Sequence, residues 1–433
     1  MITKRFRDLG ERKRSPVRGI LGVSVALVAL LAGSGSARAD LGLQPRVLGM
    51  GGARAATAAG VEAIFTNPAN LALPGQKPFE MSLVGLGLFA YNSSLSLHFY
   101  NRYNGDSLDD REKEQILAYF PDDGWKLGLL SEVPLLGLRI GRFGLGVQAV
   151  ADGGITLPKE LVRRPLYGIG MHETYRLEPF AGQAVGYAKA TLAYAQPFRV
   201  PSFDRFAIGL GVGYVVGLVH AEILEARGYF QNDFNASLDW RVRARTGTLG
   251  SGYAVDLGMS AARGNFRFGL ALTPVVSHIA WKEKTEEHFY WVSGDSLNVT
   301  RLDTLDADEV FDQRDSTYAV GAFSTSLPTQ LIAGMAYQWG RLVLAVDYHQ
   351  YFEKRYAHTT SPEFALGIES RHISFLPLRC GVSFGGGRKV RPSLGLGFYL
   401  PGLRWDIAIG GSGSMLPERW NGLSVGTSLR LAF

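Results

Sequence analysis

Residues 207–214, AIGLGVGY, alternate small and bulky side chains at every position. Successive side chains of a strand point to opposite faces, so the bulky residues would share one face and the glycines and alanine the other. Residues 378–385 and 393–398 repeat this alternation. Strands of soluble proteins normally place charged or hydrogen-bonding side chains on the second face. A bulky face opposite a small face instead indicates a barrel whose outside meets lipid and whose inside meets a lumen or a plug.

The same pattern continues to the last residue. Residues 423–433 alternate in the same way, and the sequence stops on Phe433. An amphipathic C-terminal strand that ends on an aromatic residue resembles the recognition signal of bacterial outer-membrane barrels. We therefore expect Phe433 to act as an assembly signal, with the barrel assembly machinery as a partner.

Residues 1–39 have the three parts of a secretory signal peptide. Residues 1–18 are basic, residues 19–32 are apolar, and Ala37-Arg38-Ala39 is a small-x-small cleavage site. The apolar run is too short to span a bilayer as a helix. Residues 40–433 hold equal numbers of basic and acidic side chains, so the net charge of +6 belongs to the leader and indicates no nucleic-acid partner.

Alternating segments and turn signals together predict fourteen strands within residues 79–433. The even count puts both ends of the barrel on the periplasmic side and the long loops, including 152–182 and 281–316, on the outside. We therefore expect an all-β, transmembrane, antiparallel barrel in the lipid of the bacterial outer membrane. The expected strands are 79–100, 126–139, 143–151, 183–196, 205–223, 238–262, 266–280, 317–338, 341–353, 363–375, 378–386, 391–400, 403–411 and 422–433.

Residues 40–78 lack this alternation and instead are small and turning. Gly49, Gly51 and Gly52 permit tight turns with positive φ. Asn67-Pro68-Ala69-Asn70 reads as a turn that no helix would continue through. These features predict a small N-terminal plug, or hatch, in the lumen of the barrel.

Residues 46–73 resemble the N-terminal segment of the FadL/TodX-like outer-membrane proteins and of their PorV-like relatives. In these families a short hatch with an Asn-Pro-Ala motif precedes a fourteen-stranded barrel. Asn67, Pro68 and Ala69 carry the resemblance, together with the glycines of GMGG (residues 49–52). The resemblance implies that the hatch lies in the lumen and that a lateral opening passes hydrophobic molecules towards the lipid. It does not identify a substrate-binding pocket.

Residues 106–120, DSLDDREKEQILAYF, differ from the rest of the chain because they have helical periodicity. Ser107 or Asp109 could cap such a helix, which we expect to lie outside the barrel, over its mouth. Surface helices of this kind shape a hydrophobic entry groove in FadL-like proteins, and a helix that only packs on the rim is the alternative. The candidate residues for substrate capture are Ile116, Leu117, Tyr119 and Phe120.

Other chemistry has little support in the sequence. The range 281–316 has a net charge of −6, and carboxylates at this density could hold Ca²⁺, but a solvated acidic loop needs no ligand and is the better explanation of the charge. The histidines lack metal-site spacing, the Gly-x-Gly pairs precede no helix, and Cys380 is the only cysteine. We expect no metal, no cofactor and no enzymatic activity.

The sequence therefore predicts a barrel for the passive transport of small hydrophobic compounds. The alternative is a barrel scaffold for the secretion or surface attachment of proteins, as in the PorV-like relatives.

Overall fold

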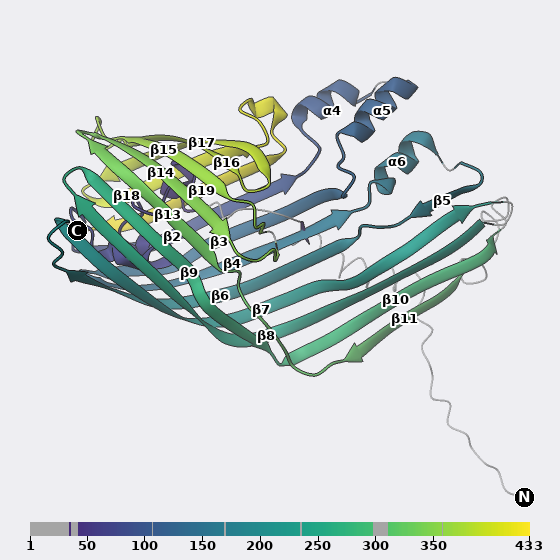
Figure 1. Cartoon of the computed structure of the whole chain (residues 1–433), viewed down its shortest axis with the longest axis horizontal. Helices are drawn as coiled ribbons and strands as arrows, with labels where there is room; N and C mark the ends of the chain where they lie inside the picture. The colour runs from purple at the N-terminus through teal and green to yellow at the C-terminus, as the bar shows by residue number, and fades with distance from the viewer. Residues whose placement is uncertain are drawn as a thin grey trace, which may run out of the picture.

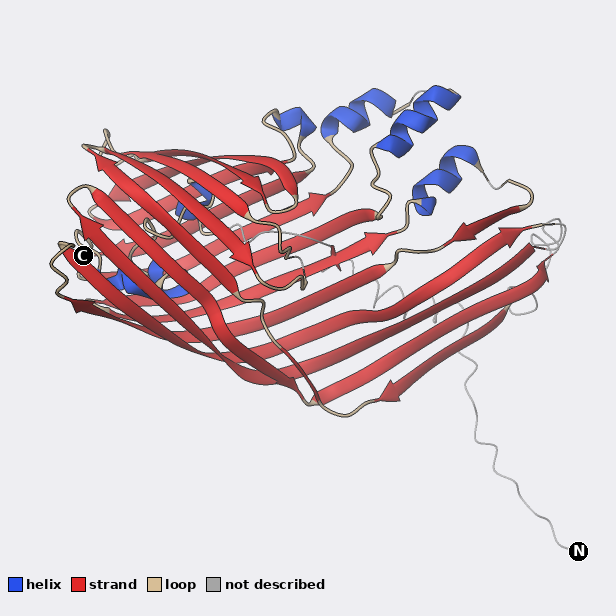
Figure 2. Ribbon diagram, viewed as in Figure 1, coloured by secondary structure: helices blue, strands red, loops and turns tan. Residues whose placement is uncertain are grey.

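The computed structural model describes residues 34–35, 42–105, 107–168, 170–233, 236–297, 311–356 and 358–433. Within these ranges, fourteen antiparallel strands form a closed barrel, which confirms the predicted fold class (Figures 1 and 2). The ring closes where β19 pairs with β2, from Gly422 opposite Tyr91 to Ala432 opposite Glu80. The barrel strands are β2 (Phe79–Asn92), β3 (Trp125–Ile140), β4 (Phe143–Leu157), β6 (Ala181–Phe198), β7 (Arg205–Asn232), β8 (Ala236–Arg263), β9 (Phe266–Trp281), β13 (Gln330–Trp339), β14 (Leu342–Tyr351), β15 (Glu363–Ser370), β16 (Leu378–Gly385), β17 (Arg388–Leu400), β18 (Gly402–Ser412) and β19 (Gly422–Ala432).

Short turns gather at one end of the barrel, where the C-terminus also lies (Figure 1). Gly141 and Gly264 take positive φ angles of 60° and 55° in two of these turns. Phe433 exchanges backbone hydrogen bonds of 3.0 and 3.3 Å with Phe79 at the closing seam. The expected leader lies outside the described residues except for β1 (Ser34–Gly35), which pairs in parallel with β4.

The two faces of the wall are as the alternation predicts. On β7, Ile208, Leu210 and Val212 are 42–50% exposed on the outside, whereas Ala207 is fully buried on the inside. Cys380 is exposed on the outer face of β16. The outer surface of the barrel is therefore apolar, as contact with lipid requires.

Several of the predicted strand boundaries were wrong. β4 runs to Leu157 and β7 to Asn232, beyond the expected ends at 151 and 223, and β15 ends at Ser370 rather than at 375.

Two other predicted ranges run past the end of a strand. The first strand ends at Asn92 because Ser96 begins α4 (Leu97–Tyr103), where its hydroxyl accepts a 3.1 Å hydrogen bond from the amide of Phe99. The range 317–338 holds the end of β11 (Asp312–Ala319), then β12 (Phe323–Thr325) and most of β13. Pro328 lies between β12 and β13, where its lack of an N–H prevents a continuous ladder.

β7 and β8 extend far beyond the barrel. Each has 28 residues, more than twice the roughly 9–11 residues that a tilted strand needs to cross a bilayer. The extension forms a sheet that points away from the barrel in Figure 1. We call it the outer sheet; it consists of β5 (Glu173–Arg176), the outer halves of β7 and β8, β10 (Glu283–Leu297) and β11.

The outer sheet corrects the prediction that 281–316 is an irregular loop. Phe289, Tyr290 and Trp291 are strong strand formers, and they pair with both β8 and β11. Charged residues around them hid this preference in the sequence. Residues 298–310 of the predicted acidic loop lie outside the described residues.

Three helices cover the outer end of the barrel: α4, α5 (Asp110–Ala118) and α6 (Glu160–Tyr167) (Figure 2). Asp109 caps α5, because its carboxylate accepts a 2.7 Å hydrogen bond from the amide of Glu112 while the Glu112 carboxylate accepts one of 3.1 Å from the amide of Asp109. This confirms the predicted helix and one of its two candidate caps. Within the described residues, no helix is long and apolar enough to cross a membrane.

Residues 42–73 lie inside the barrel near its short-turn end (Figure 2). We call them the inner segment. It contains α2 (Pro45–Gly49), α3 (Glu62–Phe65) and the 3-10 helix η1 (Pro68–Ala72). Almost every side chain in it is buried, including those of Arg54 and Glu62.

Candidate functional site

The inner segment packs its backbone against glycines of the barrel wall. A Cβ atom on Gly209 would lie closer than 3.0 Å to the backbone of Ala69, and one on Gly381 would lie as close to the backbone of Gly51. A Cβ on Gly395 would come within 2.9 Å of Gly49. The small residues on the inward faces of the strands therefore leave the space that the inner segment occupies.

The Asn67-Pro68-Ala69-Asn70 motif is the most tightly held part of this contact. The Asn67 carboxamide caps η1 by accepting a 3.2 Å hydrogen bond from the amide of Ala69, and it donates to the carbonyl of Met259 on β8 at 3.1 Å. Asn70 donates to the carbonyls of Ala55 and Ala58 at 2.9 and 3.0 Å. Pro68 occupies the first position of η1, where a missing N–H costs nothing. The motif thus fixes one turn of the inner segment both to the rest of the segment and to the wall.

The glycine pair after Met50 forms a second fixed turn. Gly51 and Gly52 have φ angles of 70° and 97°, as predicted, whereas Gly49 ends the helix α2 and does not have a positive φ. The amide of Gly51 donates a 3.1 Å hydrogen bond to the hydroxyl of Ser393 on β17. The turn therefore needs these glycines both for its backbone conformation and for its approach to the wall.

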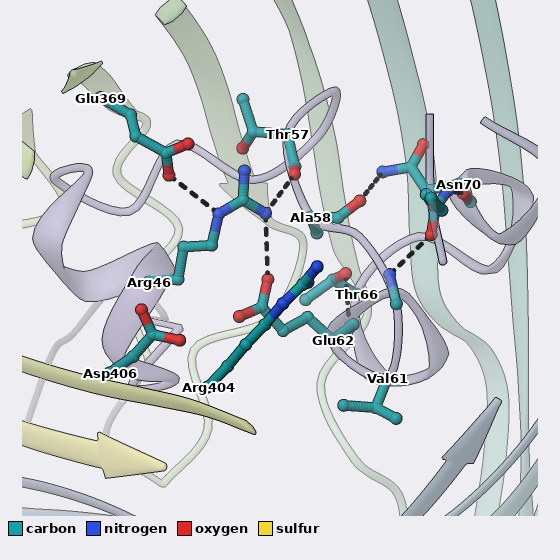
Figure 3. A network of polar contacts seen from close by, with 12 residues as sticks. Arg46, Thr57, Ala58, Val61, Glu62, Thr66, Asn70, Glu369, Arg404 and Asp406 are labelled. Atoms are coloured by element: carbon teal, nitrogen blue, oxygen red, sulfur yellow. Dashed lines mark hydrogen bonds and ion pairs between the residues drawn. The ribbon is translucent and has the colours of Figure 1, made fainter. Parts of the chain in front are cut away.

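Buried ion pairs also join the inner segment to the wall, and sequence reasoning missed them. Figure 3 shows the Arg46 guanidinium between the carboxylates of Glu369 and Glu62, at 3.0 and 3.3 Å, and the Thr57 carbonyl, at 2.8 Å. Burial by itself lowers the pKa of Arg46, but the charges of Glu369 and Glu62 more than offset this and hold the pKa above its ordinary value. Arg46 is therefore charged at every physiological pH.

Arg430 of β19 makes a second bridge. Its Nη1 atom lies 3.0 Å from Glu62 of the inner segment and 3.1 Å from Glu80 of β2, and its Nη2 atom pairs with Asp406. These ion pairs could have been suspected from the sequence, because charged residues occur on strand faces that otherwise carry only small residues.

The barrel wall is interrupted beside the inner segment. β2 and β3 pair at Ser82–Gly137 and again at Gly87–Glu132, in the same register. The four residues between these points on each of the two strands form no ladder pairs with each other in this described part of the chain. Pro134 lies in the gap and cannot donate a ladder hydrogen bond. Each strand also has a register shift there, in its pairing with the neighbour on its other side.

A narrow pocket crosses the wall at this gap. Leu86, which is 38% exposed on the outer face, and Ser82, which is buried on the inner face, both line it. Leu43, Val61 and Phe65 of the inner segment line its inner side. The pocket has a volume of about 20 Å³, room for roughly one water molecule, so a larger molecule can pass only if its walls move.

A larger cavity of about 120 Å³ lies in the lumen above the inner segment. Gln44, Phe65 and Glu132 line both this cavity and the pocket in the wall. The Phe65 ring is half-buried, and these three side chains therefore form the partition between the two spaces.

The predicted capture residues separate into two groups. Ile116 and Phe120 are buried, with exposed fractions of 5% and 4%, and Phe120 packs edge-on against Trp125. Leu117 and Tyr119 line two different external clefts, of about 830 and 780 Å³. A role in substrate capture stays a prediction for all four.

Polar clusters elsewhere have structural roles. Asp347, which shares a strand face with His349, accepts hydrogen bonds of 2.6 Å from the backbone amides of Arg54 and Ala55. Ser96 caps α4. Within the described residues, no group of three or more His, Cys, Asp or Glu side chains could hold a metal ion.

Comparison with known proteins shows a similarity of fold. No family model and no curated protein matches the sequence. Solved structures match almost over their full lengths. The Ralstonia pickettii toluene transporter TbuX is 14% identical, with 90% of this chain and 98% of that chain covered and a TM-score of 0.51. The deltaS2S3 mutant of the monoaromatic hydrocarbon channel TodX is 13% identical, with 90% and 99% covered and a TM-score of 0.55. The monoaromatic hydrocarbon channel CymD is 15% identical, with 91% and 98% covered and a TM-score of 0.50.

This chain has the barrel fold of these channels. The resemblance to TodX-like proteins is thus confirmed for the fold, while the relation to PorV-like proteins stays a prediction.

Proposed function

We propose that this protein is an outer-membrane channel for small hydrophobic compounds, with the inner segment as its hatch and the gap between β2 and β3 as its lateral exit. The interrupted β2–β3 ladder carries the proposal, because a barrel wall otherwise satisfies every backbone group by pairing. The fold shared with hydrocarbon channels supports it.

Residues that line or pack between neighbouring spaces support a route to this exit. Tyr91 lines an external cleft and packs against an apolar cluster that includes Leu130 and Val150. Leu130 and Val150 in turn line the lumenal cavity. From there only the partition that contains Phe65 and Glu132 separates a molecule from the pocket in the wall. A compound that leaves at the gap enters lipid directly.

A disulfide across the gap tests the exit. Leu86 and Val133 face each other in the register of the flanking pairs, so the variant Leu86→Cys/Val133→Cys, in a Cys380→Ser background, should draw the strands together when oxidised. We expect toluene uptake into proteoliposomes to fall several-fold on oxidation and to recover on reduction.

The control variant is Leu88→Cys/Ser131→Cys, which crosses the same two strands where they are already paired. Its oxidation should leave uptake unchanged. Equal uptake by the oxidised and reduced forms of the gap variant would contradict a lateral exit at this position.

A second function, as a scaffold for surface proteins, is supported by the outer sheet. Its edge strand β11 pairs with β10 from Asp312 to Ala319, and nearly all the side chains of β11 are exposed. We infer that a partner protein could add a strand to this edge. Thr317→Pro would place a residue without an N–H on β11 and should abolish co-purification of such a partner without changing toluene uptake. If no protein co-purifies with the unaltered chain from its own outer membrane, this second function is wrong.

A further inference from the structure

The lumenal cavity has one polar wall, built by strands that lie far apart in the sequence. Lys189 of β6 pairs with Asp256 of β8 at 2.7 Å, and His358 pairs with Asp152 of β4 at 2.8 Å. Gln330 of β13 completes this wall. A bare hydrocarbon would gain nothing from these groups, which makes their presence on the proposed route informative.

Three polar atoms on this wall have no hydrogen-bond partner among the described residues: Oδ1 of Asp152, Oδ1 of Asp256 and Nε2 of Gln330. Their side chains are deeply buried, with exposed fractions of 5%, 1% and 1%. The other oxygen of each carboxylate is already paired, which fixes the orientation of the side chain. A buried polar atom without a partner is costly, so these atoms favour a ligand that supplies hydrogen bonds.

The rest of the lining is mixed, with polar side chains such as Arg54, Glu132 and Gln148 beside a group of apolar ones. The apolar group includes Leu130, Val150, Val185 and Ile332, together with aromatic rings such as that of Tyr187. The volume of about 120 Å³ is of the order of a cavity of about 150 Å³ that binds benzene in another protein. The cavity therefore matches a single ring or a short chain that carries a polar group at one end.

The charges select the kind of polar group. Two of the three unpartnered atoms are carboxylate oxygens, which accept hydrogen bonds and repel anions. A hydroxyl can donate to such an oxygen and also accept from the Gln330 amide. A carboxylate ligand has no proton to donate to either aspartate, and the cations that line the cavity, Lys189 and Arg54, already bond to Asp256 and Gln330.

We propose that the lumenal cavity selects uncharged amphipathic molecules with a hydroxyl group, such as phenols and short alcohols, over hydrocarbons and over carboxylates. This substrate class rests on the proposed function of the protein as a channel. The aspartates act as the specificity-determining residues, and the apolar side chains hold the ring or chain.

Three ligands of nearly equal size test the selection: para-cresol, toluene and para-toluate. We expect the purified protein in detergent to bind para-cresol at least about tenfold more tightly than toluene, because a hydrogen bond to a buried carboxylate is made only by the cresol. Binding of para-toluate should be weaker still. Calorimetry or equilibrium dialysis measures the affinities, and proteoliposome uptake measures the rates.

Substitution of the two aspartates tests whether they cause the preference for cresol. Asp152→Asn and Asp256→Asn should each reduce the preference for cresol over toluene, and Asp239→Asn on the outer sheet should leave it unchanged. If either cavity variant fails to fold, the relative affinities of the unaltered protein for the three ligands still test the proposal. Equal binding of toluene and cresol would overturn the selection but leave the channel intact. Uptake of none of the compounds, with cresol still bound preferentially in detergent, would overturn the channel but not the cavity.

Discussion

The Gly209→Ala variant is expected to admit small polar solutes that the unaltered barrel excludes. The added Cβ would lie closer than 3.0 Å to the backbone nitrogen of Ala69, and backbone atoms cannot move aside as a side-chain tip can. Overpacking of this kind costs about 1–3 kcal/mol. The barrel is held by its own ladders, so we expect the inner segment, rather than the wall, to shift. The measurement is the swelling rate of proteoliposomes in a small sugar.

Gly211→Ala is the matched control, because Gly211 lies two residues further along the same face of β7. Its nearest neighbour for a new Cβ is the Cβ of Asp256 at 3.3 Å, a side-chain contact that a small adjustment relieves. We expect this variant to swell at the rate of the unaltered protein. Protease cleavage within residues 42–73 should increase for Gly209→Ala alone. If both variants swell equally slowly, close glycine packing does not hold the inner segment in place.

The barrel could be predicted from the sequence because its cause is local. Lipid outside and a packed interior impose an alternation with a period of two, and residues 207–214 and 423–433 show it without any knowledge of the rest of the chain. Strand ends were harder. Ser96 begins a helix and Pro328 lies between two strands. Each effect depends on one residue, and the alternation of small and bulky side chains does not reveal it.

The outer sheet and the site could be predicted only in part. The glycines and the Asn67-Pro68-Ala69 motif were visible as a turning segment, but their partners, such as Gly209 and Ser393, are more than 100 residues away. The resemblance implied a lateral opening, but the position of the gap was not predictable, because Pro134 has the same appearance in a continuous strand as in an interrupted one. Which strand pairs lose their hydrogen bonds is a property of the closed barrel.

The buried ion pairs were the feature hardest to predict from the sequence, and we expect the loss of one of them to cause the largest change in stability. The Arg430→Met variant keeps most of the length of the side chain but removes the cation that Glu62, Glu80 and Asp406 share. Removing one partner of a buried ion pair typically costs about 3–5 kcal/mol, because the remaining charges stay buried without compensation. We expect a large fall in the urea midpoint of the barrel in detergent micelles. The inner segment should also become sensitive to protease, since Arg430 joins Glu62 to the wall.

Arg404→Met is the control for this prediction. Arg404 approaches Glu80 only to 3.8 Å and its side chain is 29% exposed, so its loss should cost less than about 1 kcal/mol. Glu62→Gln combined with Arg430→Met should recover part of the lost stability, because it removes one of the uncompensated carboxylates while the barrel carboxylates remain. A double-mutant cycle measures this coupling. Equal losses for Arg404→Met and Arg430→Met, or no coupling between residues 62 and 430, would show that the ion pair does not fasten the inner segment to the barrel.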